Sequence, residues 1–477
     1  MRFGTSARRR LSMAVGAVAV AFGAVVLARA HGAARAPEPP NDDRAAVAHR
    51  RGPTRIDVDT PELRGFVALT QAAVLAHGTR EVFGEVRLEA LRTAGVAERR
   101  PVALAVALDV SGSMIGDKIR QARRAVAQLA ERMHPGDRLA IVAYSHEARA
   151  VVPLVPIEDA RHGLPDRLDG LAAGGGTHIP GGLSLAAAQL EGAPSGMVRR
   201  LVLVSDGQDG SGIVHSDVSR AVSGRARGGT TTSALGVGLD YDERWLTSVA
   251  DAGRGNYEFL AGGGELTRFL GRELEQASTT VADRTELTLE LPAGWRIAEA
   301  WGARVSPGRA RVPLGALFAG ERRRVTLRME VDAGAASRLH EATARLRYRA
   351  VGDETDRNLA LGRLSLSVVD DGGAVADSRD VTLHAEAVAQ HLDARQAEAV
   401  EAWRAGRRAD AERLARENLR ELERWRAAAP EAEALEARIG AASADLDNFQ
   451  QHSADSAAGR AWGLESNARR RRRAVAY

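Results

Sequence analysis

The feature that most constrains the fold is a long segment in which apolar runs alternate with amphipathic stretches. Between Pro101 and Ser278, continuous apolar runs such as Val102–Asp109 (VALAVALD) are followed by segments of helical spacing such as Lys118–Met133 (KIRQARRAVAQLAERM). A continuous apolar run is typical of a strand that is covered on both faces. Strands that alternate with helices predict an open, mostly parallel sheet with helices on both of its faces. We therefore expect a doubly wound α/β domain over residues 101–278.

The segments on either side of this α/β unit alternate apolar and polar residues with a period of two. Examples are VFGEVRLEAL within residues 55–100 and RRVTLRMEV within residues 279–370. This alternation is typical of antiparallel sheets with one buried face. One β-sandwich assembled from both flanks, with the α/β domain inserted between its strands, is the economical interpretation. Two separate small β units are the alternative.

The sequence becomes helical after the second β segment. Two helices are expected at Ala385–Ala405 and Arg407–Ala428, joined at Gly406, and Pro430 begins a third segment. The pattern of residues 381–447 resembles a single tetratricopeptide-like helical hairpin. For one hairpin alone, packing or an oligomer contact is favoured over a peptide-binding groove.

The positive charge of the chain is concentrated at its two ends. The formal net charge is +4, and the arginines at positions 2, 8–10 and 469–473 supply more than this excess. Basic and aromatic residues do not interleave in the sequence, so we expect no nucleic-acid partner. We expect residues 448–477 to form a disordered basic tail. Lys118 is the only lysine among 66 cationic residues, which we attribute to a GC-rich coding bias.

The first thirty residues have the pattern of an export signal. A positive cluster at Arg8–Arg10 precedes the uncharged apolar stretch Leu11–Leu27, and Ala28–Ala30 offers a small-residue cleavage site. The apolar stretch also has the minimum length of a spanning helix. A cleaved signal peptide and an uncleaved N-terminal membrane anchor are therefore alternatives for residues 1–30. Both alternatives place the remainder outside the cytoplasm, after a linker at residues 31–54.

Hydroxyl and carboxylate side chains occur in three separate segments of this α/β unit. Asp109, Ser111 and Ser113 alternate after the first strand, so their side chains can converge on one point. Thr177 closes a glycine-rich loop, and Asp206 ends the apolar run LVLVSD. The carboxyl ends of strands in a doubly wound sheet meet at one crevice. The chain has no cysteine, and these hard oxygen donors suit Mg²⁺, Mn²⁺ or Ca²⁺ rather than zinc.

These motifs resemble the metal-ion-dependent adhesion site of von Willebrand factor type A domains, which have a Rossmann-like fold. The matching stretches are DVSGSM (109–114), GGGTHI (174–179) and LVSDG (203–207). Another stretch, PGDRLAIVAYS, is similar to bacterial members and to the domain in inter-alpha-trypsin inhibitor heavy chains. The resemblance implies that Ser111, Ser113 and Thr177 contact a divalent cation, with Mg²⁺ the first candidate. It implies that Asp109 and Asp206 act directly or through water.

A cation that is held by few carboxylates keeps much of its positive charge and an open position. An Asp or Glu carboxylate from a protein partner could complete its shell. The sequence therefore predicts an extracytoplasmic protein that captures an acidic group of a partner through a divalent cation. The alternative is an envelope assembly or scaffold protein in which this domain mediates complex formation.

We expect no enzymatic activity, because the sequence contains neither a G-x-S-x-G nucleophile elbow nor a G-x-x-x-x-G-K-[ST] loop. His178, in the glycine-rich loop, is expected to be a solvent-facing rim residue that helps to choose ligands rather than a catalytic base.

Overall fold

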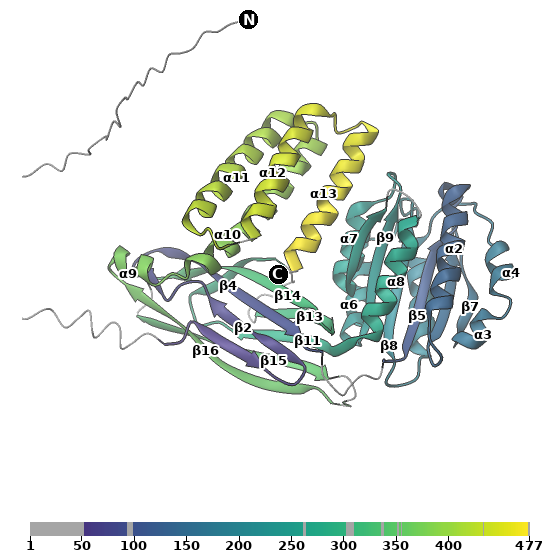
Figure 1. The fold of residues 1–477 in the computed structure, drawn as a ribbon, viewed down its shortest axis with the longest axis horizontal. Helices are drawn as coiled ribbons and strands as arrows, with labels where there is room; N and C mark the ends of the chain where they lie inside the picture. The colour runs from purple at the N-terminus through teal and green to yellow at the C-terminus, as the bar shows by residue number, and fades with distance from the viewer. Residues whose placement is uncertain are drawn as a thin grey trace, which may run out of the picture. The chain divides into compact units, whose positions relative to one another are not determined.

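The computed structural model describes residues 52–92, 99–260, 264–301, 310–334, 338–350, 353, 355–432 and 434–475 (Figure 1). The expected export signal or anchor at residues 1–30 and most of the expected linker at 31–54 lie outside these ranges. No helix in the described ranges is long and apolar enough to cross a membrane.

The α/β unit is built on a six-stranded sheet of the order β10-β9-β8-β5-β6-β7. Its strands are parallel except β7, which pairs antiparallel with β6. The strands are β5 (Val102–Asp109), β6 (Arg138–Tyr144), β7 (Ala148–Pro156), β8 (Val198–Ser205), β9 (Thr230–Val237) and β10 (Arg254–Leu260). Every residue of β5 is buried, as its uninterrupted apolar sequence predicts for a strand covered on both faces.

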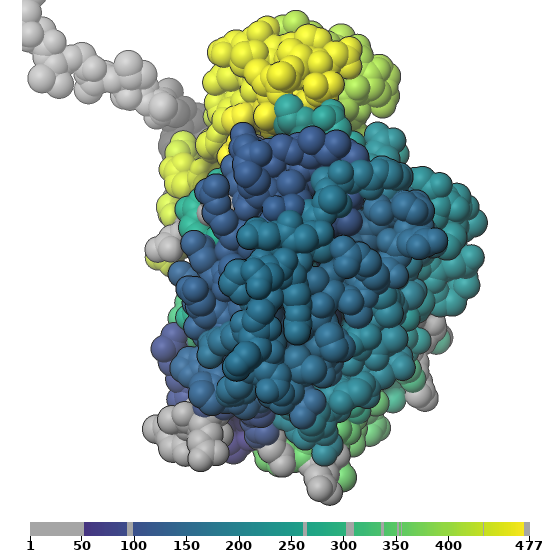
Figure 2. Space-filling view, turned by 90° about the vertical axis from the view of Figure 1, so that its right-hand side faces the viewer, coloured from purple at the N-terminus to yellow at the C-terminus, as the bar shows by residue number. Residues whose placement is uncertain are grey.

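Helices cover both faces of this sheet. Alternate side chains of β5 pack with α2, α3, α4 and α8 on one face, and the intervening side chains pack with α5, α6 and α7 on the other. The helices are α2 (Asp117–Arg132), α3 (Ile157–Arg161), α4 (Leu164–Asp169), α5 (Ile179–Glu191), α6 (His215–Arg227), α7 (Glu243–Gly253) and α8 (Gly264–Ser278). Figure 2 shows the α/β unit as the blue and teal surface that faces the viewer. The predicted doubly wound fold is confirmed.

The strand order reverses at β5. The next strand in the chain, β6, lies on one side of β5, and β8 lies on the other. Ligand sites in doubly wound sheets lie beyond the carboxyl ends of the strands at such a reversal. The carboxyl ends of β5 and β8 are Asp109 and Ser205, so the sheet places its expected ligand crevice beyond these two residues.

The two flanking segments form one β-sandwich in the described ranges. One sheet has the order β1-β2-β4-β14-β12, and the other has the order β13-β11-β15-β16-β3. The strands are β1 (Arg55–Asp59), β2 (Leu63–Leu69), β3 (Ala73–Leu75), β4 (Thr79–Ala90), β11 (Thr280–Glu290), β12 (Trp295–Trp301), β13 (Ala310–Phe318), β14 (Arg322–Asp332), β15 (Leu339–Ala350) and β16 (Arg357–Val369). Strands from both flanks pair directly, since β4 joins β14 in antiparallel register. The α/β unit is thus inserted between strands of the sandwich.

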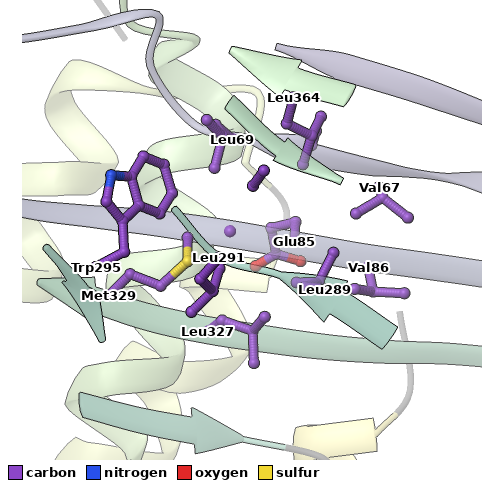
Figure 3. Close-up of a pocket in the computed structure, with 13 residues that line it drawn as sticks. Val67, Leu69, Glu85, Val86, Leu289, Leu291, Trp295, Leu327, Met329 and Leu364 are labelled. Atoms are coloured by element: carbon purple, nitrogen blue, oxygen red, sulfur yellow. The ribbon is translucent and has the colours of Figure 1, made fainter. Parts of the chain in front are cut away.

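The apolar core of the sandwich contains a void of about 10 Å³. Its lining includes Val67, Leu327, Met329 and the residue Glu85 (Figure 3). A buried water molecule needs at least this volume and several polar partners. The carboxylate of Glu85 already accepts a hydrogen bond from Arg324 Nε at 2.9 Å. The void is therefore a packing imperfection and not a ligand site.

The C-terminal region contains more helix than the sequence predicts. The helices are α9 (Gly372–Asp377), α10 (Val381–Arg404), α11 (Arg408–Ala428), α12 (Ala434–Gln451) and α13 (Ala457–Val475). The expectation of a disordered tail over residues 448–477 is wrong, because α13 spans most of that segment. The hairpin expected at residues 381–447 is accordingly part of a larger group of helices.

Helix α13 forms because its side chains have partners far away in the sequence. Leu464 and Ala468 are buried in the apolar cluster that contains residues of α7. Ser466 Oγ donates to Asp445 Oδ1 at 2.8 Å, and Arg470 Nη1 donates to Asp445 Oδ2 at 3.3 Å. The charges that make this segment look like a solvated tail are therefore partly neutralised within the fold.

Candidate metal site

Asp109, the last residue of β5, is fully buried and links the ends of two strands. Its Oδ1 atom accepts a hydrogen bond from the backbone N–H of Ser111 at 2.8 Å, and its Oδ2 atom accepts one from Ser205 Oγ at 2.8 Å. Burial raises the pKa of Asp109, while the hydrogen bonds from Ser111 and Ser205 act in the opposite direction. A cation close to this carboxylate would favour its charged form.

Two serine hydroxyls connect the loop after β5 to the loop after β8. The chain turns after β5 through a short helix, η1 (Gly112–Met114). Ser111 Oγ lies 3.0 Å from Ser113 Oγ, and Ser113 Oγ donates a hydrogen bond to Asp206 Oδ1 at 2.6 Å. Because the Ser113 proton points towards the carboxylate, the lone pairs of Ser113 Oγ remain available to a cation.

The glycine-rich loop is held against the loop after β5 by backbone hydrogen bonds. Gly112 N donates to Gly175 O at 3.0 Å, and Gly174 N donates to Val110 O at 2.8 Å. Gly175 has a φ of 80°, a conformation that favours glycine. These contacts fix the loop that carries Thr177.

Gly207 shows how closely Thr177 approaches the serine hydroxyls. A Cβ atom at Gly207 would lie 3.3 Å from Ser113 Oγ and 3.3 Å from Thr177 Oγ1. The two hydroxyls therefore flank a space that remains open because residue 207 has no side chain. The structure thus brings together the five residues that the sequence predicted as metal ligands: Asp109, Ser111, Ser113, Thr177 and Asp206.

Asp209, which the sequence analysis did not single out, positions the Thr177 loop. Its Oδ1 atom accepts a hydrogen bond from Ile179 N at 3.0 Å, and the neighbouring Gly210 N donates to Thr177 O at 2.8 Å. In the sequence, Asp209 is only an aspartate in the loop after LVLVSD. Its hydrogen-bond partner Ile179 lies 30 positions away, so no local pattern indicates this role.

His178 is half-buried, whereas the sequence analysis expected it to face solvent. A Cβ atom at Gly181 would lie 3.1 Å from His178 Nδ1, so the ring lies over the first turn of α5. A second histidine, His146, lies beside the glycine-rich loop, where its Nδ1 would be 2.8 Å from a Cβ atom at Gly175. No local sequence pattern indicates that His146 lies there.

Lys118 is the most important neighbour of the site that sequence reasoning missed. Its Nζ atom donates to Asp206 Oδ2 at 2.5 Å, and Asp206 itself is fully buried. The lysine comes from the first turn of α2 and keeps 32% of its side chain exposed. The available signal was its status as the only lysine of the chain, which we had attributed to coding bias.

The donor set fits a hard divalent cation. Three hydroxyls and two carboxylates converge, and oxygen donors of this kind bind Mg²⁺, Mn²⁺ and Ca²⁺. Within the described ranges, no group of three or more His, Cys, Asp or Glu side chains is placed to hold a metal ion. A cation at this site would therefore depend on Ser111, Ser113 and Thr177 as much as on Asp109 and Asp206.

Residues 103–267 match the family model of the von Willebrand factor type A domain. The chain is 30% identical over 192 residues to the uncharacterized protein YfbK of Escherichia coli (strain K12), which is 39% of this chain and 33% of that protein. It is 29% identical over 156 residues to inter-alpha-trypsin inhibitor heavy chain H4 of Bos taurus, which is 30% of this chain and 17% of that protein. The chain spans less than half the length of these curated relatives.

A solved structure described as von Willebrand factor type A from Catenulispora acidiphila has a similar fold. The TM-score is 0.61 at 23% sequence identity, and the match covers 80% of this chain and 91% of that chain. The similarity of fold thus extends beyond the segment that the family model matches. The α/β unit of this chain is a von Willebrand factor type A domain.

Proposed function

We propose that this chain is a metal-dependent binding protein and not an enzyme. Ser111, Ser113 and Thr177, with Asp109 and Asp206, would hold a divalent cation, with Mg²⁺ the first candidate. When bound, this cation would supply a positively charged open position for a carboxylate of a protein partner. The observation that carries the proposal is the open space at Gly207, which two hydroxyls flank at 3.3 Å from a Cβ position.

Exposed apolar side chains around the site support a role in protein binding. The most exposed large apolar side chains among the described residues include Ile115 at 67%, Val214 at 62% and Ile213 at 42%. Ile115 lies in the loop after β5, and Ile213 and Val214 lie in the loop after β8. Apolar contacts of this kind contribute to the centres of protein interfaces. We propose that they pack on the partner around its carboxylate.

Thermal unfolding of the full chain tests the metal site. The protein is treated with chelator and then titrated with Mg²⁺, Mn²⁺ or Ca²⁺. A ligand at about 100 times its dissociation constant stabilises the folded state by ~2.7 kcal/mol. For the α/β domain (residues 101–278) unfolding alone, this corresponds to a rise in unfolding temperature of roughly 5–10 °C. Ser113→Ala should abolish the shift, and Ser216→Ala, an exposed serine of α6, should retain it. No shift with any of the three ions would contradict the proposal.

The partner class is tested by panning a peptide-display library on the Mg²⁺-loaded protein and eluting with chelator. We expect the eluted peptides to be enriched in Asp or Glu. Peptides that stay bound in chelator and show no such enrichment would instead favour the scaffold role.

We also propose that the protein acts outside the cytoplasm, as a cell-surface, periplasmic or membrane-anchored chain. The support is the positive cluster at Arg8–Arg10 followed by the apolar stretch Leu11–Leu27. Cell fractionation with mass measurement of the product tests this proposal. A mature chain that begins near His31 indicates a cleaved signal, and a full-length chain in the membrane indicates an anchor. A full-length chain in the cytoplasm would refute export.

A further inference from the structure

The carboxylate of Asp206 is shared between two different groups. Its Oδ1 atom accepts from Ser113 Oγ at 2.6 Å, and its Oδ2 atom accepts from Lys118 Nζ at 2.5 Å. Asp206 has no exposed surface, whereas the Lys118 side chain is 32% exposed. A buried carboxylate thus has an ammonium group on one oxygen and a predicted metal-ligating hydroxyl on the other.

The ammonium group and the hydroxyls lie on opposite sides of Asp206. Gly238, just after β9, would bring a Cβ atom within 3.4 Å of Lys118 Nζ. A Cβ atom added at Gly207, just after Asp206, would lie 3.3 Å from both Ser113 Oγ and Thr177 Oγ1. Strand β8 lies between β9 and β5 in the sheet. Lys118 therefore approaches Asp206 from the β9 side, and the space between the hydroxyls stays free of the ammonium group.

We propose that Lys118 is a built-in second cation of the site, which weakens metal binding and strengthens the binding of an anion to the loaded site. This inference rests on the proposed metal-dependent function. Asp109 and Asp206 contribute two negative charges, and Lys118 neutralises one of them. With a divalent cation bound, the site therefore carries one net positive charge. Without Lys118, the loaded site would be neutral. At this short range, the ammonium charge lowers the affinity for the metal cation and raises the affinity of the loaded site for an anion.

The chemistry of lysine fits this role better than that of arginine. An ammonium group is compact and carries three donors, whereas a guanidinium is a planar fork. One Lys118 donor is used on Asp206, and the side chain is 32% exposed.

The test compares full-length wild type with Lys118→Met, which keeps the apolar stem, and with Lys118→Arg, which keeps the charge. Mn²⁺ binding is measured by electron paramagnetic resonance of the free ion. We expect Lys118→Met to bind Mn²⁺ about tenfold more tightly, by the Coulomb argument. Lys118→Arg should stay closer to wild type than Lys118→Met, because it keeps the charge but not the shape of the ammonium group. Binding of labelled acetate, measured by its relaxation next to Mn²⁺, should be at least threefold weaker in Lys118→Met, about the scale of one weak charge pair. Circular dichroism checks that each variant is folded.

The outcomes separate this inference from the proposed function. Mn²⁺ binding by wild type with no gain in Lys118→Met would overturn the role of Lys118 and leave the metal site standing. If Lys118→Met binds Mn²⁺ and wild type does not, the result would support the claim that Lys118 weakens metal binding. It would also contradict the proposed function, because the wild-type protein would then not hold a metal. If neither protein binds Mn²⁺, the proposed function fails and this inference fails with it.

Discussion

Gly207 is the residue on which the open space of the site depends most directly. A Cβ atom there would meet Ser113 Oγ and Thr177 Oγ1 at 3.3 Å each. Gly207 has no positive φ, so alanine fits its backbone conformation. We predict that Gly207→Ala lowers Mg²⁺ affinity at least tenfold, roughly 1.4 kcal/mol, by narrowing the space between the hydroxyls. Isothermal titration calorimetry measures this change.

The control for this prediction is Gly192→Ala, at the end of α5. The nearest atom to a Cβ there is Gln189 O at 3.5 Å, an ordinary contact. We expect this variant to keep wild-type Mg²⁺ affinity. Equal affinities for Gly207→Ala and wild type would show that the cation does not lie between Ser113 and Thr177.

The predicted ligands could be found from sequence because local patterns mark the strand ends of Asp109 and Asp206 and the glycine-rich loop of Thr177. Asp109 ends an uninterrupted apolar run, and Asp206 ends another. Lys118 could not be found in this way, because its pairing with Asp206 spans 88 positions. That pairing depends on where α2 begins relative to β8, which no local pattern specifies. A residue's rarity was the only sign, and rarity alone does not indicate a contact.

At the scale of elements, α13 is joined to the von Willebrand factor type A domain by apolar contact. Leu464 is 7% exposed and belongs to the same cluster as Trp245 and Leu246 of α7. We predict that Leu464→Ala costs about 2–5 kcal/mol of stability, the usual range for truncating a buried leucine. Amide hydrogen exchange should become faster in both α13 and α7. Faster exchange in α13 alone would show that the two helices are not coupled.

Val381→Ala is the matched control for Leu464→Ala. Val381 is 43% exposed at the start of α10. Loss of two exposed methyl groups at a surface position usually changes stability by less than about 0.5 kcal/mol. Exchange in α13 and α7 should stay as in wild type.

The apolar pattern predicted the helices with a clear buried stripe and failed for α13. Helix α2 buries Ile119, Val126 and Leu129 on one face, which periodicity reveals. In α13 the apolar contacts are few, and Ser466 and Arg470 are buried by pairing with Asp445. Side chains that are buried as hydrogen-bonded pairs look like solvated residues in a sequence.

At the scale of the whole molecule, α10 contacts both the sandwich and the von Willebrand factor type A domain. Near its start, Glu386 Oε2 accepts from Arg324 Nη2 at 2.7 Å, and Arg324 lies in β14. At its end, Arg404 Nη1 donates to Glu243 Oε2 at 2.7 Å, and Glu243 begins α7. One helix of 24 residues thus bridges the two parts through ion pairs. Buried pairs of this kind are costly to break, because the remaining charge loses its partner.

His384 makes the contact between α10 and the sandwich sensitive to pH. Its Nδ1 atom lies 3.0 Å from Thr70 Oγ1, and its ring meets Phe83 edge-on with centroids 5.5 Å apart. Burial, with a smaller contribution from the charge of Arg379, lowers the pKa of His384 to about 4. The packed form therefore holds the ring neutral.

Protonation of His384 should favour separation of α10 from the sandwich. Free histidine has a pKa of about 6.5, so below this pH the unfolded state takes up a proton that the folded state does not. Stability is fully present above pH 6.5, falls by up to about 3 kcal/mol as the pH drops towards 4, and then levels. His384→Gln should flatten this part of the stability–pH profile in urea unfolding, whereas His162→Gln, an exposed histidine of the α/β unit, should leave it unchanged. The same slope in wild type and His384→Gln would assign the acid sensitivity to carboxylates, because His384 would then bind its proton equally in both states.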